Sequence, residues 1–251
     1  MPYRRLPKTD QARLQTLRQA VKQAGEADFM DQVMSFKLIN EAQRFLPVFE
    51  TQLSQYRQNC QTKVTANKQY KHIVGNARMY ISHFIQVLNL AVIRGDIRKE
   101  QKALYQLDIH EHVLPDLTTE EDLLLWGQRI IDGETERVKQ GGFPIYNPTI
   151  SKVKVHYDIF KEKQVTQQQH KSNTQRTFKG MESLRVDADK LILEIWDTVE
   201  NHYKDLPPYK RLCACQKYGL IYYYRTGEKQ LTPETDKQWE YNRQQPLTLD
   251  L

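Results

Sequence analysis

Apolar residues recur every three or four positions over most of the chain, which is the spacing of one face of an α-helix. We expect a short first helix between a cap at Thr9 or Asp10 and a stop at Gly25. Two longer series, in residues 36–60 and 70–91, predict two long helices. Their apolar positions are Phe36, Ile39, Ala42, Leu46, Phe49, Leu53, Tyr56 and Cys60, then Tyr70, Val74, Ala77, Ile81, Phe84, Leu88 and Ala91.

Residues 35–95 are predicted to form a helical hairpin. A single helix of that length would extend roughly 90 Å at 1.5 Å per residue, which is long for burial in one domain. The middle, Ser54–Gln69, is polar, and Asn59–Asn67 is the expected reversal. Pro47 interrupts the first apolar series without shifting its phase, so we interpret it as a kink. The alternative is two short helices, the second beginning at Pro47.

Residues 148–204 repeat this plan and predict a second hairpin. Their polar middle is Gln164–Gln175, and Ser172–Thr174 is the expected reversal because such side chains hydrogen-bond locally and compete with a helix. The apolar positions are Ile150, Val153, Tyr157 and Phe160, then Met181, Leu184, Ala188, Leu191 and Ile195. The shared plan indicates a pseudo-repeat of 35–95 and 148–204. Lysines would gather at the two tips, which lie at the same end or at opposite ends of the bundle.

Between the predicted hairpins, Lys99–Leu117 is expected to be a connector with at most one short helix. Thr118 and Glu121 have the spacing of a capping box that opens a further helix, which Gly141-Gly142 ends. Asn147-Pro148 is then expected to open the next helix, with a cap residue and a preset φ.

The C-terminal part has a different pattern. Pro207-Pro208 is suited to begin a short helix that ends at Gly219. Residues 220–224 are β-branched and aromatic, and they predict one short strand. The polar tail, 232–251, is expected to lie on the surface or fray. The sequence therefore predicts an all-α fold: a single helical domain over 1–251, with two long antiparallel hairpins packed as a bundle, a short N-terminal helix and one short strand.

Composition narrows the class of protein. Ten Gly in 251 residues disfavour an all-β sandwich and a glycine-looped nucleotide fold, and three Cys are too few to staple a secreted domain of this size. The most apolar segment, Met79–Ile93, is shorter than a membrane helix and is interrupted by polar residues. No targeting signal is recognised near the start. We therefore expect a cytoplasmic protein without membrane contact.

The net charge of +6 and the pI of about 9.0 hide an uneven distribution. Residues 37–103 hold eleven Lys or Arg and four Asp or Glu, whereas residues 108–136 hold one Arg and nine Asp or Glu. Basic helix faces together with the arm Tyr3–Leu6 favour nucleic-acid binding as an alternative function. The acidic block can instead lie against the basic ones, and the arm can simply pack on the domain.

Known catalytic patterns are missing from the sequence. No Glu is followed by His three positions later, which disfavours a ferritin-like di-iron site, and His-Glu-x-x-His is also absent. His110 and His112 form the densest group of potential metal ligands, and Cys213 and Cys215 form a Cys-x-Cys pair with only Cys60 remaining. We interpret the histidines as surface residues and the cysteines as small, half-buried side chains. The sequence predicts no cofactor and no metal.

Two further motifs have structural explanations. Arg94-Gly95-Asp96 matches an adhesion tripeptide, but a helix cap explains its glycine. Tyr222–Tyr224 beside Arg225 can stack on bases or sugars, although alternate residues of a strand face opposite sides, so we favour packing.

Two segments, Pro2–Leu14 and Tyr218–Arg225, resemble parts of uncharacterised helical proteins from gut bacteria. The resemblance implies a bacterial, intracellular helical fold, and it carries over no site residues. We therefore expect a non-enzymatic helical scaffold or protein-interaction module with a protein partner, and homo-oligomerisation stays open. Nucleic-acid binding through basic helix faces and the N-terminal arm is the alternative.

Overall fold

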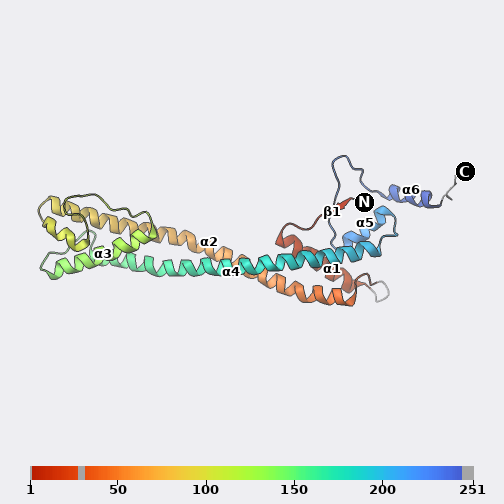
Figure 1. The fold of residues 1–251 in the computed structure, drawn as a ribbon, viewed down its shortest axis with the longest axis horizontal. Coiled ribbons are helices and arrows are strands. Elements are labelled where there is room, and N and C mark those ends of the chain that lie inside the picture. The colour runs from red at the N-terminus through yellow and green to blue at the C-terminus, as the bar shows by residue number, and fades with distance from the viewer. Residues whose placement is uncertain (1, 28–31, 245–251) are drawn as a thin grey trace. The chain divides into compact units, whose positions relative to one another are not determined.

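The computed structural model describes residues 2–27 and 32–244, and 74% of these residues are helical (Figure 1). The all-α prediction is confirmed. The helices are α1 (Asp10–Glu26), α2 (Phe36–Ile93), the 3₁₀ helix η2 (Lys99–Tyr105), α3 (Glu120–Lys139), α4 (Ile150–His202), α5 (Pro208–Lys217) and α6 (Pro233–Gln244). None of them is long and apolar enough to cross a membrane, within the residues described.

The reversal predicted in the middle of each hairpin is wrong, because each predicted hairpin is one unbroken helix in the structure. α2 passes through Asn59–Asn67 and α4 passes through Ser172–Thr174 without a reversal. The two helices instead pair with each other, antiparallel. Because an α-helix satisfies its own backbone hydrogen bonds, a polar stretch needs a partner on only one side and does not have to be buried. Pro47 lies inside α2, so the alternative of two helices meeting there is also wrong.

Contacts divide the chain into two compact units. Unit 1 comprises Met1–Gln58 and Gln175–Leu251, and unit 2 comprises Asn59–Thr174. The α2–α4 pair contributes to both units. In unit 1 the Gln52 side chain donates to the Thr177 carbonyl at 3.4 Å, and in unit 2 the Gln167 side chain donates to Asn67 Oδ1 at 3.3 Å.

Unit 1 is built on α1, the first part of α2, the second part of α4, and α5. The Thr9 hydroxyl caps α1 by accepting from the Ala12 N–H at 3.2 Å, as the sequence predicts. The buried core combines apolar residues from each of these helices. Members that are at most 1% exposed include Leu17, Phe49, Ile192, Ile195 and Trp196.

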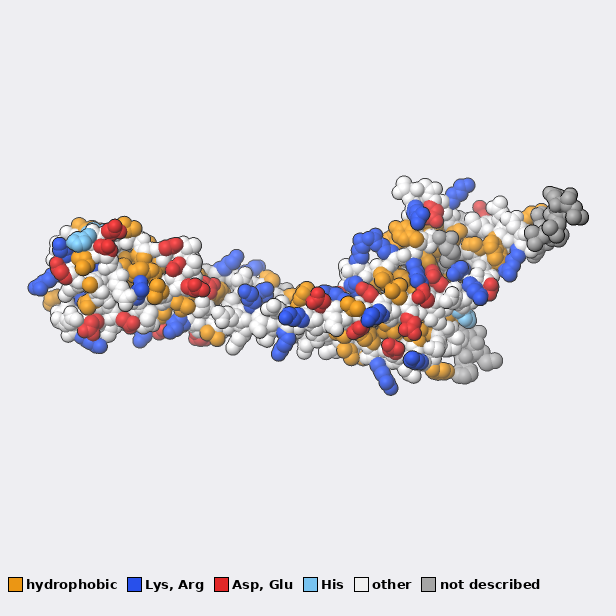
Figure 2. Space-filling model, in the orientation of Figure 1, with side chains coloured by type: hydrophobic (Ala, Val, Ile, Leu, Met, Phe, Trp, Pro, Cys, Tyr) orange, Lys and Arg blue, Asp and Glu red, His pale blue; other side chains and the backbone are white. Residues whose placement is uncertain are grey.

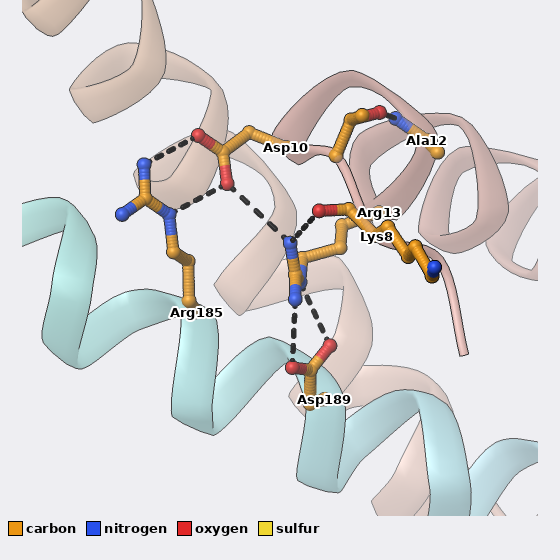
Figure 3. A network of polar contacts seen from close by, with 7 residues as sticks. Lys8, Asp10, Ala12, Arg13, Arg185 and Asp189 are labelled. Carbon is orange, nitrogen blue, oxygen red and sulfur yellow. Dashed lines mark hydrogen bonds and ion pairs between the residues drawn. The ribbon is translucent and has the colours of Figure 1, made fainter.

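A network of charged side chains fastens the start of α1 to α4 (Figure 3). Arg185 donates two hydrogen bonds to the Asp10 carboxylate, at 2.7 and 2.8 Å. Arg13 donates two to the Asp189 carboxylate, at 2.7 and 2.9 Å, and its guanidinium lies 3.6 Å from Asp10. The hydrogen bonds from Arg185 hold the pKa of the Asp10 carboxyl below its usual value.

This lowered pKa predicts how the network depends on pH. A carboxyl whose pKa is depressed by folding stabilises the folded state above its unfolded pKa, about 3.9, and loses that contribution as the pH falls through the folded pKa. We therefore expect Asp10→Asn to lower the melting temperature at pH 7, and the difference from the wild type to shrink below about pH 4. A difference that stays constant from pH 7 to pH 3 in thermal melts would contradict the assignment of Asp10.

The N-terminal arm packs on unit 1. It forms β1 (Tyr3–Arg4), which pairs antiparallel with β2 (Tyr222–Tyr223), so that Tyr3 lies opposite Tyr223. Arg4 forms ion pairs with Asp197 and Glu200 of α4. The strand predicted at 220–224 is therefore confirmed at its centre, and the arm supplies its partner.

The polar tail contains a helix that the sequence analysis missed. α6 contacts α5, and its Asp236 carboxylate accepts from the Tyr209 and Lys210 N–H groups at 2.7 and 2.9 Å. Asp236 is buried and caps the start of α5. Residues 245–251, the rest of the predicted tail, lie outside the described residues.

Unit 2 consists of the second part of α2, η2, α3 and the first part of α4. The predicted connector indeed holds one short helix, η2. The capping box of α3 is formed by Thr119 and Asp122, one position later than predicted. α4 begins at Ile150 after Thr149, rather than at Asn147-Pro148, and the Thr149 hydroxyl accepts from the Lys152 N–H at 3.4 Å. The core includes Ile81, Phe84, Leu88, Leu123, Ile130, Val153 and Phe160.

Candidate functional site

A pocket of about 730 Å³ lies in unit 2, where α2 ends and the chain passes from α3 to α4. Its lining combines apolar and basic side chains, and the loop 141–147 forms one wall. The side chains used below are Val87, Ala91, Arg94, Asp96, Ile97, Arg98, Arg137, Phe143, Pro144 and Tyr146. A concave site with a few convergent polar groups is the usual form of a ligand-binding site.

A buried polar network lies directly behind the pocket. Glu134 and Arg137 of α3 are 0% and 1% exposed, and Tyr105 of η2 is fully buried. Arg137 Nε donates to Glu134 Oε2 at 2.9 Å, and its Nη2 donates to Glu134 Oε1 at 2.8 Å. The Tyr105 hydroxyl donates to Glu134 and accepts from Arg137 Nε at 2.8 Å. Burial raises the pKa of Tyr105, so this hydroxyl remains a hydrogen-bond donor.

The same network fixes the loop 141–147. Arg137 Nη2 donates to the Phe143 carbonyl at 2.8 Å, and the Ile145 N–H donates to Glu134 Oε1 at 2.9 Å. Desolvating an ion pair is costly unless further hydrogen bonds satisfy its remaining groups, and the loop backbone supplies these bonds. Arg137 and Glu134 are therefore positioning residues for the pocket wall.

Two glycines allow this close packing. A Cβ added at Gly133 would lie 2.5 Å from the Tyr105 ring, and one added at Gly142 would lie 2.7 Å from Arg137 Nη1. Neither distance is compatible with a side chain in place. The sequence predicts Gly142 only as a helix end, and its close approach to Arg137 is visible only in the structure.

The fixed loop presents two aromatic side chains to solvent. Phe143 is 86% exposed and Tyr146 is 78% exposed, whereas Ile145 between them is buried in the core. Both aromatic residues belong to the pocket lining. Aromatic side chains are enriched in protein interfaces, where they contribute much of the binding energy.

A second surface feature is the basic helix pair, which we define as residues 59–74 of α2 and 163–174 of α4. Its charged residues are Lys63, Lys68, Lys71, Lys163 and Lys171, and it contains no Asp or Glu. The Thr174 hydroxyl lies 3.4 Å from the Asn59 carbonyl, and the Gln167 side chain donates to Asn67 at 3.3 Å, so the two segments run antiparallel. On the face drawn in Figure 2, blue Lys and Arg side chains with few red ones lie along the middle of α2 and α4.

The histidines of the predicted ligand group are exposed in the connector between η2 and α3. The His110 N–H donates to Asp108 at 2.7 Å, and the His112 carbonyl accepts from Asn89 at 3.2 Å. Beside them Lys102 is buried; it donates to the Glu111 carbonyl, and burial lowers its pKa. Over the described residues, no group of three or more His, Cys, Asp and Glu is placed to hold a metal ion.

The cysteines are divided between the units. Cys215 is buried and Cys213 is half-buried on α5 of unit 1, whereas Cys60 belongs to unit 2. Burial raises the pKa of Cys215, which keeps it a thiol. The half-buried position predicted for the pair is thus found for Cys213 alone.

The remaining candidates have structural contacts of their own. The Tyr222 hydroxyl donates to Glu200 at 2.6 Å, and the exposed Tyr223 ring lies 6.1 Å from the Tyr3 ring. Gly95 has a φ of 82°, which confirms its role as the cap of α2. Its neighbours Arg94 and Asp96 line the pocket, a role that the sequence analysis missed.

Comparisons with protein-family models, curated proteins and solved structures found no match for this chain. The resemblance to helical proteins of gut bacteria therefore stays a prediction. The pocket and the basic helix pair are therefore described from this structure alone.

Proposed function

We propose that the protein is a non-enzymatic helical interaction module that recognises a protein partner at the unit 2 pocket. The observation that carries this proposal is the exposure of Phe143 and Tyr146 on a loop fixed by a buried ion pair. A loop held this firmly loses little conformational entropy on binding, so its aromatic side chains are preorganised for contact. Burying two such rings against a partner would remove a large apolar area from water.

Site-specific photo-crosslinking tests this function. We expect p-benzoylphenylalanine at position 143 of the full chain to give a discrete adduct in an extract of the native host. Excess unlabelled wild-type protein should compete for the adduct, whereas a Phe143→Ser, Tyr146→Ser double variant should not. Position 186 is the control, because Val186 is exposed on α4 in unit 1. Equal adducts from both positions, or competition by the double variant, would contradict the proposal.

Nucleic-acid binding is a second candidate, and the basic helix pair favours it. Polar helices whose only charges are lysines can neutralise phosphates and release counterions. The sequence also assigns Arg4 and Arg5 of the N-terminal arm to this function, and of these two Arg4 is paired with Asp197 and Glu200. The proposal therefore rests on the lysines of the helix pair.

Salt-dependent binding of a fluorescein-labelled single-stranded oligonucleotide tests this second function. A Lys68→Gln, Lys71→Gln, Lys171→Gln variant should weaken binding and reduce the slope of log K against log salt by up to about 2, at about 0.7 per phosphate contact. The matched control replaces three exposed lysines elsewhere, Lys139, Lys204 and Lys229, by Gln. Equal slopes for the two variants would exclude the helix pair as the binding surface.

A further inference from the structure

We propose that the unit 2 pocket binds a carboxylate of the partner protein, flanked by an apolar side chain. The inference rests on the proposed function, because it names the chemistry recognised at the same site. It follows from one guanidinium nitrogen that has no hydrogen-bond partner among the described residues, the balance of charges around the pocket, and the apolar part of its lining.

The first observation concerns Arg137. Its Nε and Nη2 atoms are occupied by Glu134, Tyr105 and the Phe143 carbonyl. In the described part of the chain its Nη1 has no hydrogen-bond partner, yet Nη1 is not among the fully buried unpartnered atoms. Arg137 and Gly142 both line the pocket, and a Cβ added at Gly142 would lie 2.7 Å from Nη1, so Nη1 lies at the pocket wall. A guanidinium that is almost fully buried forms stronger hydrogen bonds to an anion than one in bulk water.

The second observation is the charge of the pocket. Arg94, Arg98 and Arg137 contribute three positive charges. Asp96 accepts from Arg94 Nε at 3.0 Å, and Glu134 pairs with Arg137, so two of these charges are balanced. Arg98 is exposed and makes no ion pair among the described residues. One excess positive charge matches a carboxylate, which is a monoanion, better than a phosphate monoester, which is close to a dianion at neutral pH.

The third observation is the apolar part of the lining. Val87, Ala91, Ile97 and Pro144 line the same pocket as the arginines, and the Phe143 and Tyr146 rings extend from it into solvent. An anion bound by Arg98 and Arg137 would therefore have apolar surface beside it. A carboxylate next to an apolar side chain fits both the arginines and the apolar lining. The carboxylate would orient the ligand, and the apolar side chain would be buried against the lining.

Isothermal titration of the full chain with N-acetylphenylalanine tests the inference. We expect saturable binding at least ten-fold tighter than that of N-acetylphenylalanine amide, the neutral counterpart. Arg98→Gln should weaken binding at least five-fold by removing the unpaired charge. Gly142→Ala should weaken it similarly, because the added methyl group lies against Arg137 Nη1. Lys139→Gln is the matched control: Lys139 is exposed nearby at the end of α3 but does not line the pocket, so binding should stay within two-fold.

Three results would overturn the inference: equal binding of the acid and the amide, unchanged binding by both Arg98→Gln and Gly142→Ala, or tighter binding of phenyl phosphate than of N-acetylphenylalanine. The last would assign the pocket to a phosphate group. If a partner is crosslinked at position 143 but the acid and the amide bind equally, the proposed function is supported and the carboxylate inference is wrong. If the acid binds more tightly than the amide but no partner is crosslinked, the pocket binds a carboxylate and the proposed protein recognition is wrong.

Discussion

Replacing Glu134 by glutamine should lower the free energy of unfolding by about 3–5 kcal/mol, the usual cost of leaving a buried charge without its partner. Arg137 is 1% exposed, and among the described residues Glu134 is the only carboxylate that pairs with it. Glutamine keeps the shape of the side chain, so the loss reports the uncompensated guanidinium rather than a cavity. Urea denaturation followed by circular dichroism measures the effect.

Glu136→Gln provides the matched control. Glu136 lies two residues away on α3, its side chain is 49% exposed, and its carboxylate lies 3.9 Å from the Lys139 ammonium group. Because an exposed pair contributes little, we expect a change within about 0.5 kcal/mol. A Glu134 variant as stable as this control would mean that the network does not fix the pocket wall.

Replacing Thr65 by proline should cost about 3 kcal/mol or more and reduce the helical circular dichroism signal. Thr65 is exposed in the middle of α2, inside the segment where the sequence predicts a reversal. Proline there removes the N–H that bonds to the carbonyl of Gln61 and crowds that turn.

Thr65→Ala is the control for this substitution. It removes the same side chain while favouring the helix, so we expect unchanged or slightly raised stability. A proline variant as stable as the alanine variant would show that residues 59–67 form a loop, and would restore the hairpin prediction.

The helices themselves could be predicted from the sequence because their apolar faces repeat at helical spacing. The two predicted reversals, one in each long helix, are wrong for the same physical reason. Residues 54–69 and 164–175 have few apolar anchors, and a polar segment between two apolar series resembles a turn. In the structure these segments are joined by polar contacts such as that of Gln167 with Asn67, which leave no periodic apolar signal. These two helical segments have few apolar residues, so their composition is like that of a loop.

The candidate site was harder to predict. Glu134 and Arg137 are spaced three apart on an amphipathic helix, where such a pair normally faces solvent. Nothing in their spacing distinguishes a buried pair from an exposed one. The glycines at 133 and 142 are the only local signal, since each admits a bulky neighbour, but the sequence does not identify that neighbour. Phe143 lies directly after Gly141-Gly142, and its exposure follows only from the path of the loop.

The measurement that tests the pocket as a recognition site most directly is a ¹⁵N–¹H correlation spectrum of the full chain, titrated with N-acetylphenylalanine. If the pocket is the recognition site, the amide signals of Gly141, Gly142, Phe143 and Tyr146 move together and saturate. The signals of Lys68 and Lys171 in the basic helix pair stay in place. Saturable shifts in unit 1 or in the helix pair, with the loop 141–147 unchanged, would contradict it.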